Sequence, residues 1–267
     1  MSLFILAFAP GVFLCVYVYF RDRYERENPF TVLRTFLWGM AVVAPAIVVE
    51  AVLVPGAANL DKASLAARAT AFFLVIGPLE ELLKFAVVYL RVYPTAEFNE
   101  PMDGIVYSTA SAMGFASLEN LLYVWQEGPH AAFLRAFLAV PGHLFFSGVW
   151  GYHLGMTFRH RGEKGRVFGS LLLASLLHGG YDFVVVSQTP FALLVVPLMV
   201  IMGVIFLREI DLALDRSPMK PSEPEPDRGP EGVVTCPGCG APTSARGTTC
   251  QHCGLLLPPE GYDESGH

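Results

Sequence analysis

Apolar stretches long enough to cross a lipid bilayer recur along the first 216 residues of this 267-residue chain. A helix needs about 20 mostly apolar residues to span the roughly 30 Å of hydrocarbon. The sequence predicts such helices at residues 2–20, 32–54, 66–92, 102–125, 131–158, 167–187 and 190–208. We therefore expect an all-α polytopic membrane protein with about seven transmembrane helices.

The amino-acid composition agrees with a protein that lies in the bilayer. Hydrophobic residues make up 53% of the chain and charged residues 16%, whereas charged residues are about 25% of soluble domains. These values exclude intrinsic disorder and a soluble enzyme of ordinary composition. The net charge of −6 also excludes a basic nucleic-acid-binding domain, so no direct contact with nucleic acid is expected.

The distribution of Lys and Arg predicts the orientation of the chain. These residues gather after the first, third, fifth and last spans, and the other connections offer only Lys62, Arg68 and Arg135. Loops rich in Lys and Arg stay in the cytoplasm. We therefore expect the N-terminus outside the cell and the C-terminus in the cytoplasm. The first span should be retained, because Arg21-Asp22-Arg23 stands where a signal peptide has small residues.

A change of composition near residue 216 divides the chain into three parts. Residues 1–216 form the apolar transmembrane domain. Residues 217–232 contain five prolines and are acidic, which predicts a semi-extended linker. Residues 233–267 hold four of the five cysteines, and the fifth, Cys15, lies in an apolar stretch. The transmembrane domain therefore has no disulfide framework.

The cysteines of the tail form two Cys-x-x-Cys pairs separated by ten residues. They are Cys236, Cys239, Cys250 and Cys253, and Gly240 and Gly254 follow the two pairs. Four thiolates at this spacing are typical of a structural zinc site. Two disulfides are the alternative, but they need an oxidising compartment, and the tail is expected in the cytosol. We therefore predict a cytoplasmic zinc ribbon, which could dock a cytosolic protein partner.

Ionisable side chains inside membrane spans are costly, so each of them is a candidate for function. They fall into four groups: Glu80-Glu81-x-x-Lys84, Phe115-x-x-x-Glu119-Asn120, His143 and His178-x-x-x-Asp182. Counted from the outer ends of four different spans, these groups fall within one band of about 15 Å. We therefore expect one site that four helices build together.

In the third span, the spacing of the charged residues predicts which helix face each of them occupies. Glu80 and Lys84 are four residues apart, so they share a helix face and can pair. Glu81 is turned by about 100° and can face another helix. Pro78 is expected to restart the helix, so that both glutamates lie in a first turn, where the helix dipole favours a carboxylate.

The fifth and sixth spans carry the two histidines. Pro141-Gly142 is expected to break the helix just before His143, and irregular backbone at membrane depth is tolerated only against protein or a water-filled cavity. His178 and Asp182 are four residues apart, so the carboxylate can orient the imidazole. Both histidines are therefore expected to face the shared site.

Three other features are interpreted as structural. Glu50 lies near the outer end of the second span and is expected to extend to the membrane surface. Asp103 is interpreted as a helix-start residue. Ser147, Gly151 and Gly155 form a ridge of small residues that is typical of helix packing.

In their order along the chain, the four groups resemble the motifs of the PrsW intramembrane proteases, which belong with the CAAX prenyl endopeptidases and the Abi proteins. The similarity covers about residues 70–190. The wider superfamily usually has Arg after the glutamate pair and His in the second motif, whereas this chain has Lys84 and Glu119-Asn120. These departures indicate the PrsW branch and argue against prenylated substrates.

The resemblance implies a bacterial membrane peptidase that cleaves membrane-anchored proteins, with anti-sigma factors as the better-known substrates of the family. The candidate catalytic residues are Glu80, Glu81, His143, His178 and Asp182, supported by Lys84, Glu119 and Asn120. Glu81, or else Glu80, is expected to activate water, with His143 assisting the proton transfer. His178, oriented by Asp182, would bind the carbonyl oxygen and its developing negative charge.

The residues leave other readings open. Two histidines and several carboxylates could bind a catalytic metal, although the chain has no His-Glu-x-x-His motif, and the resemblance favours a site without metal. A buried network of Glu, His, Asp and Lys also occurs in proton-coupled transporters and channels, many of which have internal repeats that this chain lacks. A non-catalytic membrane scaffold that presents the zinc ribbon is the third reading.

Overall fold

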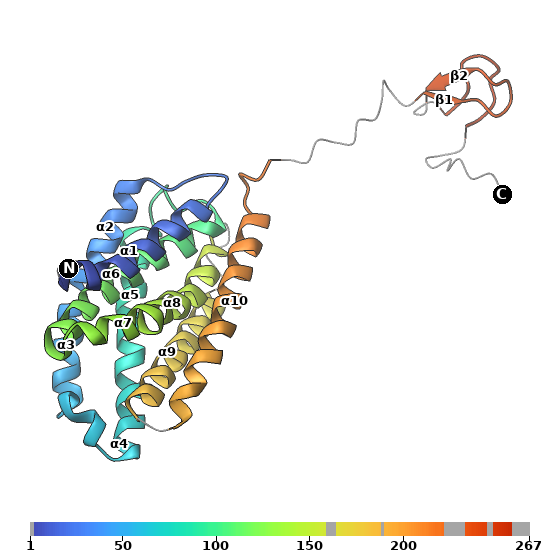
Figure 1. Ribbon diagram of the computed structural model, residues 1–267. Coiled ribbons are helices and arrows are strands. Elements are labelled where there is room, and N and C mark those ends of the chain that lie inside the picture. Colours follow the sequence, from blue (N-terminus) through green and yellow to red (C-terminus); the bar gives the residue numbers. More distant parts are fainter. Residues whose placement is uncertain (1–2, 159–163, 188–189, 222–232, 245–247, 258–267) are drawn as a thin grey trace. The chain divides into compact units, whose positions relative to one another are not determined.

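The computed structural model describes residues 3–158, 164–187, 190–221, 233–244 and 248–257. Its described part is almost entirely helical (Figure 1). The chain divides into two compact units, Met1–Lys220 and Pro221–His267. The first unit holds the apolar helices, and the second holds the cysteine-rich segment.

The first unit contains α-helices joined by short turns. In chain order the elements are α1 (Leu3–Arg21), α2 (Pro29–Ala41), α3 (Val43–Leu53), η1 (Ala57–Lys62), α4 (Leu65–Thr70), η2 (Ala71–Ile76), α5 (Gly77–Arg91), α6 (Pro101–Glu127), α7 (Pro129–Phe137), α8 (Ala139–Gly155), α9 (Lys164–Val186), η3 (Pro190–Leu194) and α10 (Val195–Asp215). The elements η1 and η3 are 3₁₀ helices, and η2 is a π-helix.

Five stretches are long and apolar enough to cross a membrane. They are Leu3–Arg21, Pro29–Leu53, Phe133–Gly155, Lys164–Val186 and Ala192–Asp215. They coincide with five of the seven expected spans. The other two expected spans, 66–92 and 102–125, are also helical but carry the motif glutamates and Lys84. A total of seven spans stays a prediction, because length and composition support five.

Helix α6 is the central helix of this unit, and its residues from Pro101 to Ser117 are all buried. It packs against α1, α2 and α8. Glycines allow these helices to approach closely: a Cβ on Gly114 would collide with the carbonyl oxygen of Phe36 in α2. The second motif, which follows in α6, is therefore carried by a tightly held helix.

The ridge of small residues on α8 packs as expected. A Cβ on Gly151 would meet Ser108 of α6, and a Cβ on Gly155 would meet the carbonyl oxygen of Pro101. Asp103 lies in the first turn of α6, as predicted for a helix-start residue, and its carboxylate accepts the backbone N–H of Glu100 at 2.9 Å. These contacts fix the position of α8 along the axis of α6, and therefore also the position of His143 on α8.

The sequence predicts helix starts at Pro78 and at Pro141-Gly142, and the structure confirms the first but not the second. Helix α5 begins at Gly77 with Pro78 in its first turn, as predicted, and it follows the π-helical turn η2. Of the two glutamates predicted in that turn, Glu80 lies in it and Glu81 follows it. The expected break at Pro141-Gly142 is wrong. The chain turns at Leu138, between α7 and α8, and Pro141 lies in the first turn of α8. A proline is tolerated there because the first backbone N–H groups of a helix have no partner within it.

The second unit contains one small antiparallel sheet. Strand β1 (Val233–Thr235) pairs with β2 (Pro242–Ser244), with Val234 opposite Thr243. An isolated bridge joins Thr249 to Leu256. Most of the expected linker, residues 222–232, lies outside the described residues.

Candidate active site

The ammonium group of Lys84 on α5 lies at the centre of the motif residues. It donates hydrogen bonds to Oε2 of Glu80 (3.2 Å), Oε1 of Glu81 (3.0 Å) and Nδ1 of His143 on α8 (2.9 Å). Lys84 is fully buried, with Nζ 4.3 Å from the ring centroid of Phe115. An ammonium has three protons, so these acceptors use its whole donor capacity. The predicted pairing of Glu80 with Lys84 is confirmed, and Glu81 shares the same lysine.

His143 is held at both ring nitrogens. Since Nδ1 accepts from Lys84, the ring of a neutral His143 carries its proton on Nε2, and Nε2 lies 2.9 Å from Oε2 of Glu119 on α6. The same Glu119 oxygen accepts a hydrogen bond from Nη2 of Arg135 at 2.8 Å. The first, second and third motifs are therefore joined through one imidazole ring.

His178 on α9 lies among three carboxylates. Its Nδ1 is 3.0 Å from Oε1 of Glu81, and its Nε2 is 3.6 Å from Oε2 of Glu80 and 3.5 Å from Oδ2 of Asp182. The ring is 4.9 Å from that of His143, centroid to centroid, and stacks on Phe146 at 5.3 Å. Asp182 is thus close enough to orient His178, as the spacing predicts, but Glu81 makes the shorter contact.

Glu81 is also tied to α8. Its Oε2 accepts hydrogen bonds from Ser147 Oγ at 2.8 Å and from Trp150 Nε1 at 2.9 Å. Together with Lys84 and His178, these make four donors for one fully buried carboxylate. The side chain that was expected to face another helix therefore faces two, α8 and α9.

The cluster is least buried on the side of Glu119 and Asp182. Their side chains are 20% and 23% exposed, whereas those of Lys84 and Glu81 are 0% exposed. Glu50 of α3, which we expected at the membrane surface, is half-buried with Oε1 enclosed, and α3 packs against α5 and α6, the helices that carry Glu80 and Glu119. Glu50 therefore lies toward the site.

The sequence reasoning missed three residues that contact the motif carboxylates: Ser147, Trp150 and Arg135. Ser147 and Trp150 follow His143 by four and seven residues, so they share its helix face. That spacing was a usable signal, but we assigned Ser147 to packing alone. The sequence predicts Arg135 only as a charge in a connection between spans. Asn120 supports Arg135, because its Oδ1 accepts from Nε of Arg135 at 3.2 Å.

The donor set of the site is compatible with a metal ion. Glu80, His143 and His178 each offer one ligand atom, and these atoms lie within 4.8 Å of one another. Two imidazoles and one carboxylate are a known ligand set of catalytic zinc. Glu80 and His143 also accept hydrogen bonds from Lys84. A metal ion would therefore compete with the Lys84 ammonium for these acceptors, because Nδ1 of His143 has only one lone pair.

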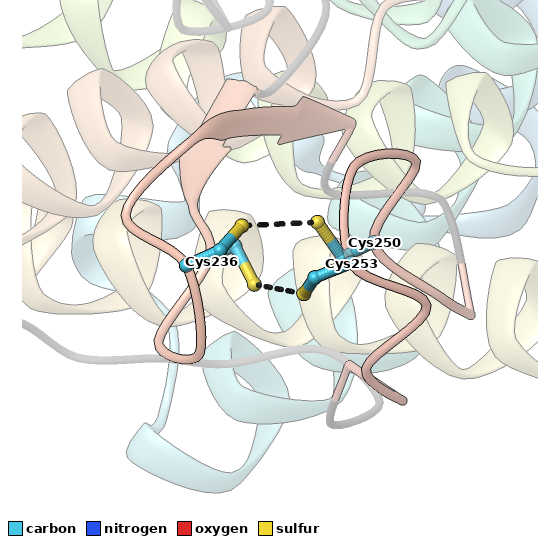
Figure 2. A group of neighbouring side chains, drawn as sticks. Cys236, Cys250 and Cys253 are labelled. Carbon is cyan, nitrogen blue, oxygen red and sulfur yellow. Dashed lines mark hydrogen bonds between the residues drawn. The ribbon is translucent and has the colours of Figure 1, made fainter.

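The four cysteines of the second unit form a separate cluster. Figure 2 shows Cys236, Cys250 and Cys253 with their sulfur atoms turned toward one another. The Sγ atoms of Cys236 and Cys253 are 3.6 Å apart, and those of Cys239 and Cys250 are 3.8 Å apart. A disulfide has an S–S distance of about 2.05 Å, whereas tetrahedral zinc with Zn–S bonds of about 2.3 Å separates its sulfurs by about 3.8 Å. The cluster could hold zinc.

The two turns of this cluster have the expected backbone. Gly240 and Gly254, which follow the cysteine pairs, have φ angles of 69° and 73°. This left-handed region costs glycine little and other residues more. The predicted glycine turns are therefore confirmed.

Comparisons with known proteins agree with this geometry. The family model described as "PrsW family intramembrane metalloprotease" matches residues 27–207. Protease PrsW of Geobacillus kaustophilus is 42% identical over 188 residues, which cover 70% of this chain and 81% of the relative. Protease PrsW of Bacillus subtilis is 38% identical over 204 residues, covering 75% and 90%. That of Oceanobacillus iheyensis is 33% identical over 214 residues, covering 80% and 96%.

No solved structure matches the chain. The description of this family names a metalloprotease, whereas the resemblance of the sequence motifs favours a site without metal. The relatives are proteases, and the comparisons give no support to the transporter or the scaffold. The chain therefore belongs to the PrsW family of intramembrane proteases and is a bacterial membrane peptidase.

Proposed function

We propose that the two glutamates have different tasks: Glu80 activates water, and Glu81 holds the other catalytic side chains in place. The supporting observation is the number of donors on each carboxylate. Glu81 accepts four hydrogen bonds, which use the roughly four acceptor positions of a carboxylate. Among the described residues, Glu80 accepts a hydrogen bond from Lys84 alone. Glu80 therefore has lone pairs available for a water molecule.

In this mechanism Glu80 takes a proton from water as the oxygen attacks the carbonyl carbon of the substrate. The developing oxyanion binds near His178 Nε2, which lies 3.6 Å from Glu80 and 3.5 Å from Asp182. When the C–N bond breaks, Glu80 returns the proton to the leaving amine. Glu81 orients His178 by accepting the hydrogen of Nδ1, and Asp182 balances the charge of the ring.

Lys84 and His143 keep Glu80 in position in this scheme. Lys84 binds Glu80 directly, and His143 accepts the third proton of the same ammonium. His143 thus assists the proton transfer through Lys84 rather than by contact with the water. A preorganised array of donors and charges of this kind lowers the barrier because it needs no reorganisation during the reaction.

The same residues could hold a divalent cation in place of the hydrogen bonds that Glu80 and His143 accept from Lys84. Glu80, His143 and His178 would hold it. Bound there, it would polarise the carbonyl oxygen and acidify water. Chelation therefore has to be tested with a protein whose ribbon no longer binds zinc, such as the double variant Cys236→Ser, Cys250→Ser.

The expected substrate is a membrane-anchored protein, because membrane helices carry the site and the relatives are named as proteases. Anti-sigma factors are the candidate substrates that the resemblance suggests. The Lys and Arg distribution supports an N-terminus outside the cell and a cytoplasmic C-terminus. In that orientation the ribbon carries a structural zinc in the cytosol and is available to a cytosolic protein partner.

The experiment is a cleavage assay in liposomes with single-span proteins as substrates. It compares wild type with Glu80→Gln, Glu81→Gln and Glu209→Gln, a buried glutamate of α10 that pairs with none of the motif residues among those described. Glu80→Gln should lower kcat about 10²- to 10⁴-fold without lowering the Tm. Glu81→Gln should lower both kcat and the Tm, because four donors lose an ionised acceptor. Glu209→Gln should cleave normally.

Two outcomes would contradict this assignment. Full activity of Glu80→Gln would return the role of base to Glu81. No cleavage by wild type, together with an ion flux that is sensitive to the same variants, would indicate the transporter. Loss of cleavage under chelation in the double cysteine variant would place a metal at Glu80, His143 and His178.

A further inference from the structure

We propose that Arg135 of α7 is a positioning residue of the peptidase site, which holds Glu119 against His143. The inference rests on the proposed function of His143. Its basis is that one carboxylate oxygen of Glu119 accepts hydrogen bonds from two side chains. Oε2 of Glu119 accepts from Nη2 of Arg135 at 2.8 Å and from Nε2 of His143 at 2.9 Å. A movement of Arg135 would therefore displace the carboxylate that fixes the imidazole.

Arg135 itself is fixed by one turn of α6. Its Nε donates to Oδ1 of Asn120 at 3.2 Å, and its guanidinium carbon lies 3.8 Å from the ring centroid of Tyr123. Asn120 is held in turn, because its Nδ2 donates to the carbonyl oxygen of Ala7 on α1 at 3.2 Å. The planar guanidinium thus uses two donors and one face at once, a combination that lysine cannot reproduce.

The break at Leu138 makes the shared contact geometrically accessible. In a continuous helix, residues eight apart are separated by about 12 Å along the axis. Arg135 and His143 are eight residues apart and yet bind the same oxygen. Leu138 has φ −120° and ψ −60°, so the chain changes direction there. Helix α7 can therefore bring Arg135 back over Glu119 while α8 carries His143 into the site.

The charges also show why a positive group is needed at this place. His143 contacts the ammonium of Lys84 through Nδ1 and the carboxylate of Glu119 through Nε2. Glu119 is 20% exposed and Arg135 19% exposed at the side chain, so the pair lies at the rim of the site. Without Arg135, Glu119 would have one anchor instead of two and could rotate away from the ring. The expected role of Arg135 is the orientation of His143.

The test is a double-mutant cycle in the full-length protein, with kcat and KM measured separately. Arg135→Gln and Glu119→Gln should each lower kcat about 10- to 100-fold, with little change in KM. This is the range found when the group that orients a metal-binding histidine is removed. Because both act through the same contact, the double variant should be no slower than Glu119→Gln. Arg135→Lys should restore part of kcat, since it keeps the charge but loses the fork.

The matched control is Arg91→Gln. Arg91 also lies over an aromatic ring, with its guanidinium carbon 4.5 Å from the centroid of Trp38, and it is at the far end of α5 from Glu80. This variant should keep the wild-type kcat. Normal kcat in Arg135→Gln, or a loss in the double variant equal to the product of the single losses, would overturn the proposal. If Arg135→Gln did not fold, the same cycle with Arg135→Lys would decide.

A second measurement does not depend on cleavage. Nitrogen NMR of ¹⁵N-histidine-labelled protein reports the proton position on each ring, and the His143→Gln variant identifies the signals of His143. Arg135→Gln should shift these signals and Arg91→Gln should not. Unchanged His143 signals would overturn the positioning role even if the proposed peptidase reaction failed. A wild type that cleaves nothing would contradict the proposed function alone.

Discussion

Trp150 on α8 donates its indole N–H to Oε2 of Glu81 on α5 across 2.9 Å. Ser147, one turn earlier on α8, donates to the same oxygen, while Lys84 and His178 bind the other oxygen. One carboxylate therefore joins three helices, α5, α8 and α9. The position of the candidate catalytic groups depends on this junction, and several predictions about it can be tested by substitution.

The indole donor can be removed while the aromatic ring is kept. Trp150→Phe should retain packing against Phe85, whose ring lies 5.3 Å from that of Trp150, but Glu81 loses one donor. We expect kcat to fall about tenfold, the effect of roughly 1.4 kcal/mol, measured in the liposome assay. Trp38→Phe, at an exposed position of α2, is the control. Equal activity of both variants would show that this hydrogen bond does not position Glu81.

Close packing of η2, the π-helical turn that leads directly into α5, against α9 sets the distance between Glu80 and His178. A Cβ on Gly179 would collide with the carbonyl oxygen of Phe72, whereas a Cβ on Gly169 of the same helix meets nothing within 4 Å. Gly179→Ala should destabilise the protein by about 1–3 kcal/mol and lower cleavage, and Gly169→Ala should do neither. Thermal unfolding and the cleavage assay measure both. A Gly179→Ala protein as stable as wild type would contradict this packing.

Removal of zinc should affect the second unit alone. Purified protein should contain about one zinc per ribbon, because four thiolates complete one tetrahedral site. A chelator should abolish the dispersed NMR signals of residues 233–257, since small zinc ribbons fold only with their metal. The helical circular dichroism of the first unit should keep its Tm. A lower Tm on chelation of the double cysteine variant would instead indicate a metal in the helical unit.

Asp22, in the loop after α1, should make stability depend on pH. Its side chain is fully buried, and burial together with the charge of Asp103 raises the pKa of Asp22 to about 7. The folded state therefore binds this proton more tightly than the unfolded state does, and ionisation favours unfolding. The resulting destabilisation is absent below about pH 4, grows up to about pH 7 and is constant above it.

Asp22→Asn removes that ionisation. At pH 8 the variant should have a Tm about 2–4 °C higher than wild type, and the difference should disappear as the pH falls toward 4. Asp61→Asn, at an exposed position of η1, is the control and should leave the pH dependence of the Tm unchanged. A variant with the wild-type Tm at pH 8 would show that Asp22 does not oppose folding at that pH.

Much of the site could be predicted because its residues follow the helical repeat. The separations of Glu80 from Lys84 and of His178 from Asp182 are four residues, and both pairs are in contact. The cysteine spacing likewise predicted the compact cluster of the second unit. Such patterns can be predicted from the sequence because they depend on one element or on two adjacent turns.

Other features depend on contacts between elements and are not contained in a local pattern. Arg135 reaches Glu119 only because the chain turns at Leu138, and no proline or glycine marks that turn. The spacing of Trp150 from His143 places it on the same helix face, but its partner Glu81 is defined only by the packing of α5 beside α8. Glu50 lies near the end of a span, so its inward direction depends on how α3 packs against its neighbours.

Lys84 and its two glutamates occupy little more than one turn of a single helix. In the predicted span 66–92, α5 therefore carries the counter-ion of its own acidic groups and does not depend for it on α8 or α9, which follow later in the chain. An ion pair within one segment is less costly to insert than separate charges that must wait for partners. The helix that brings the acidic groups to the site thus also supplies the charge that lowers the cost of their insertion.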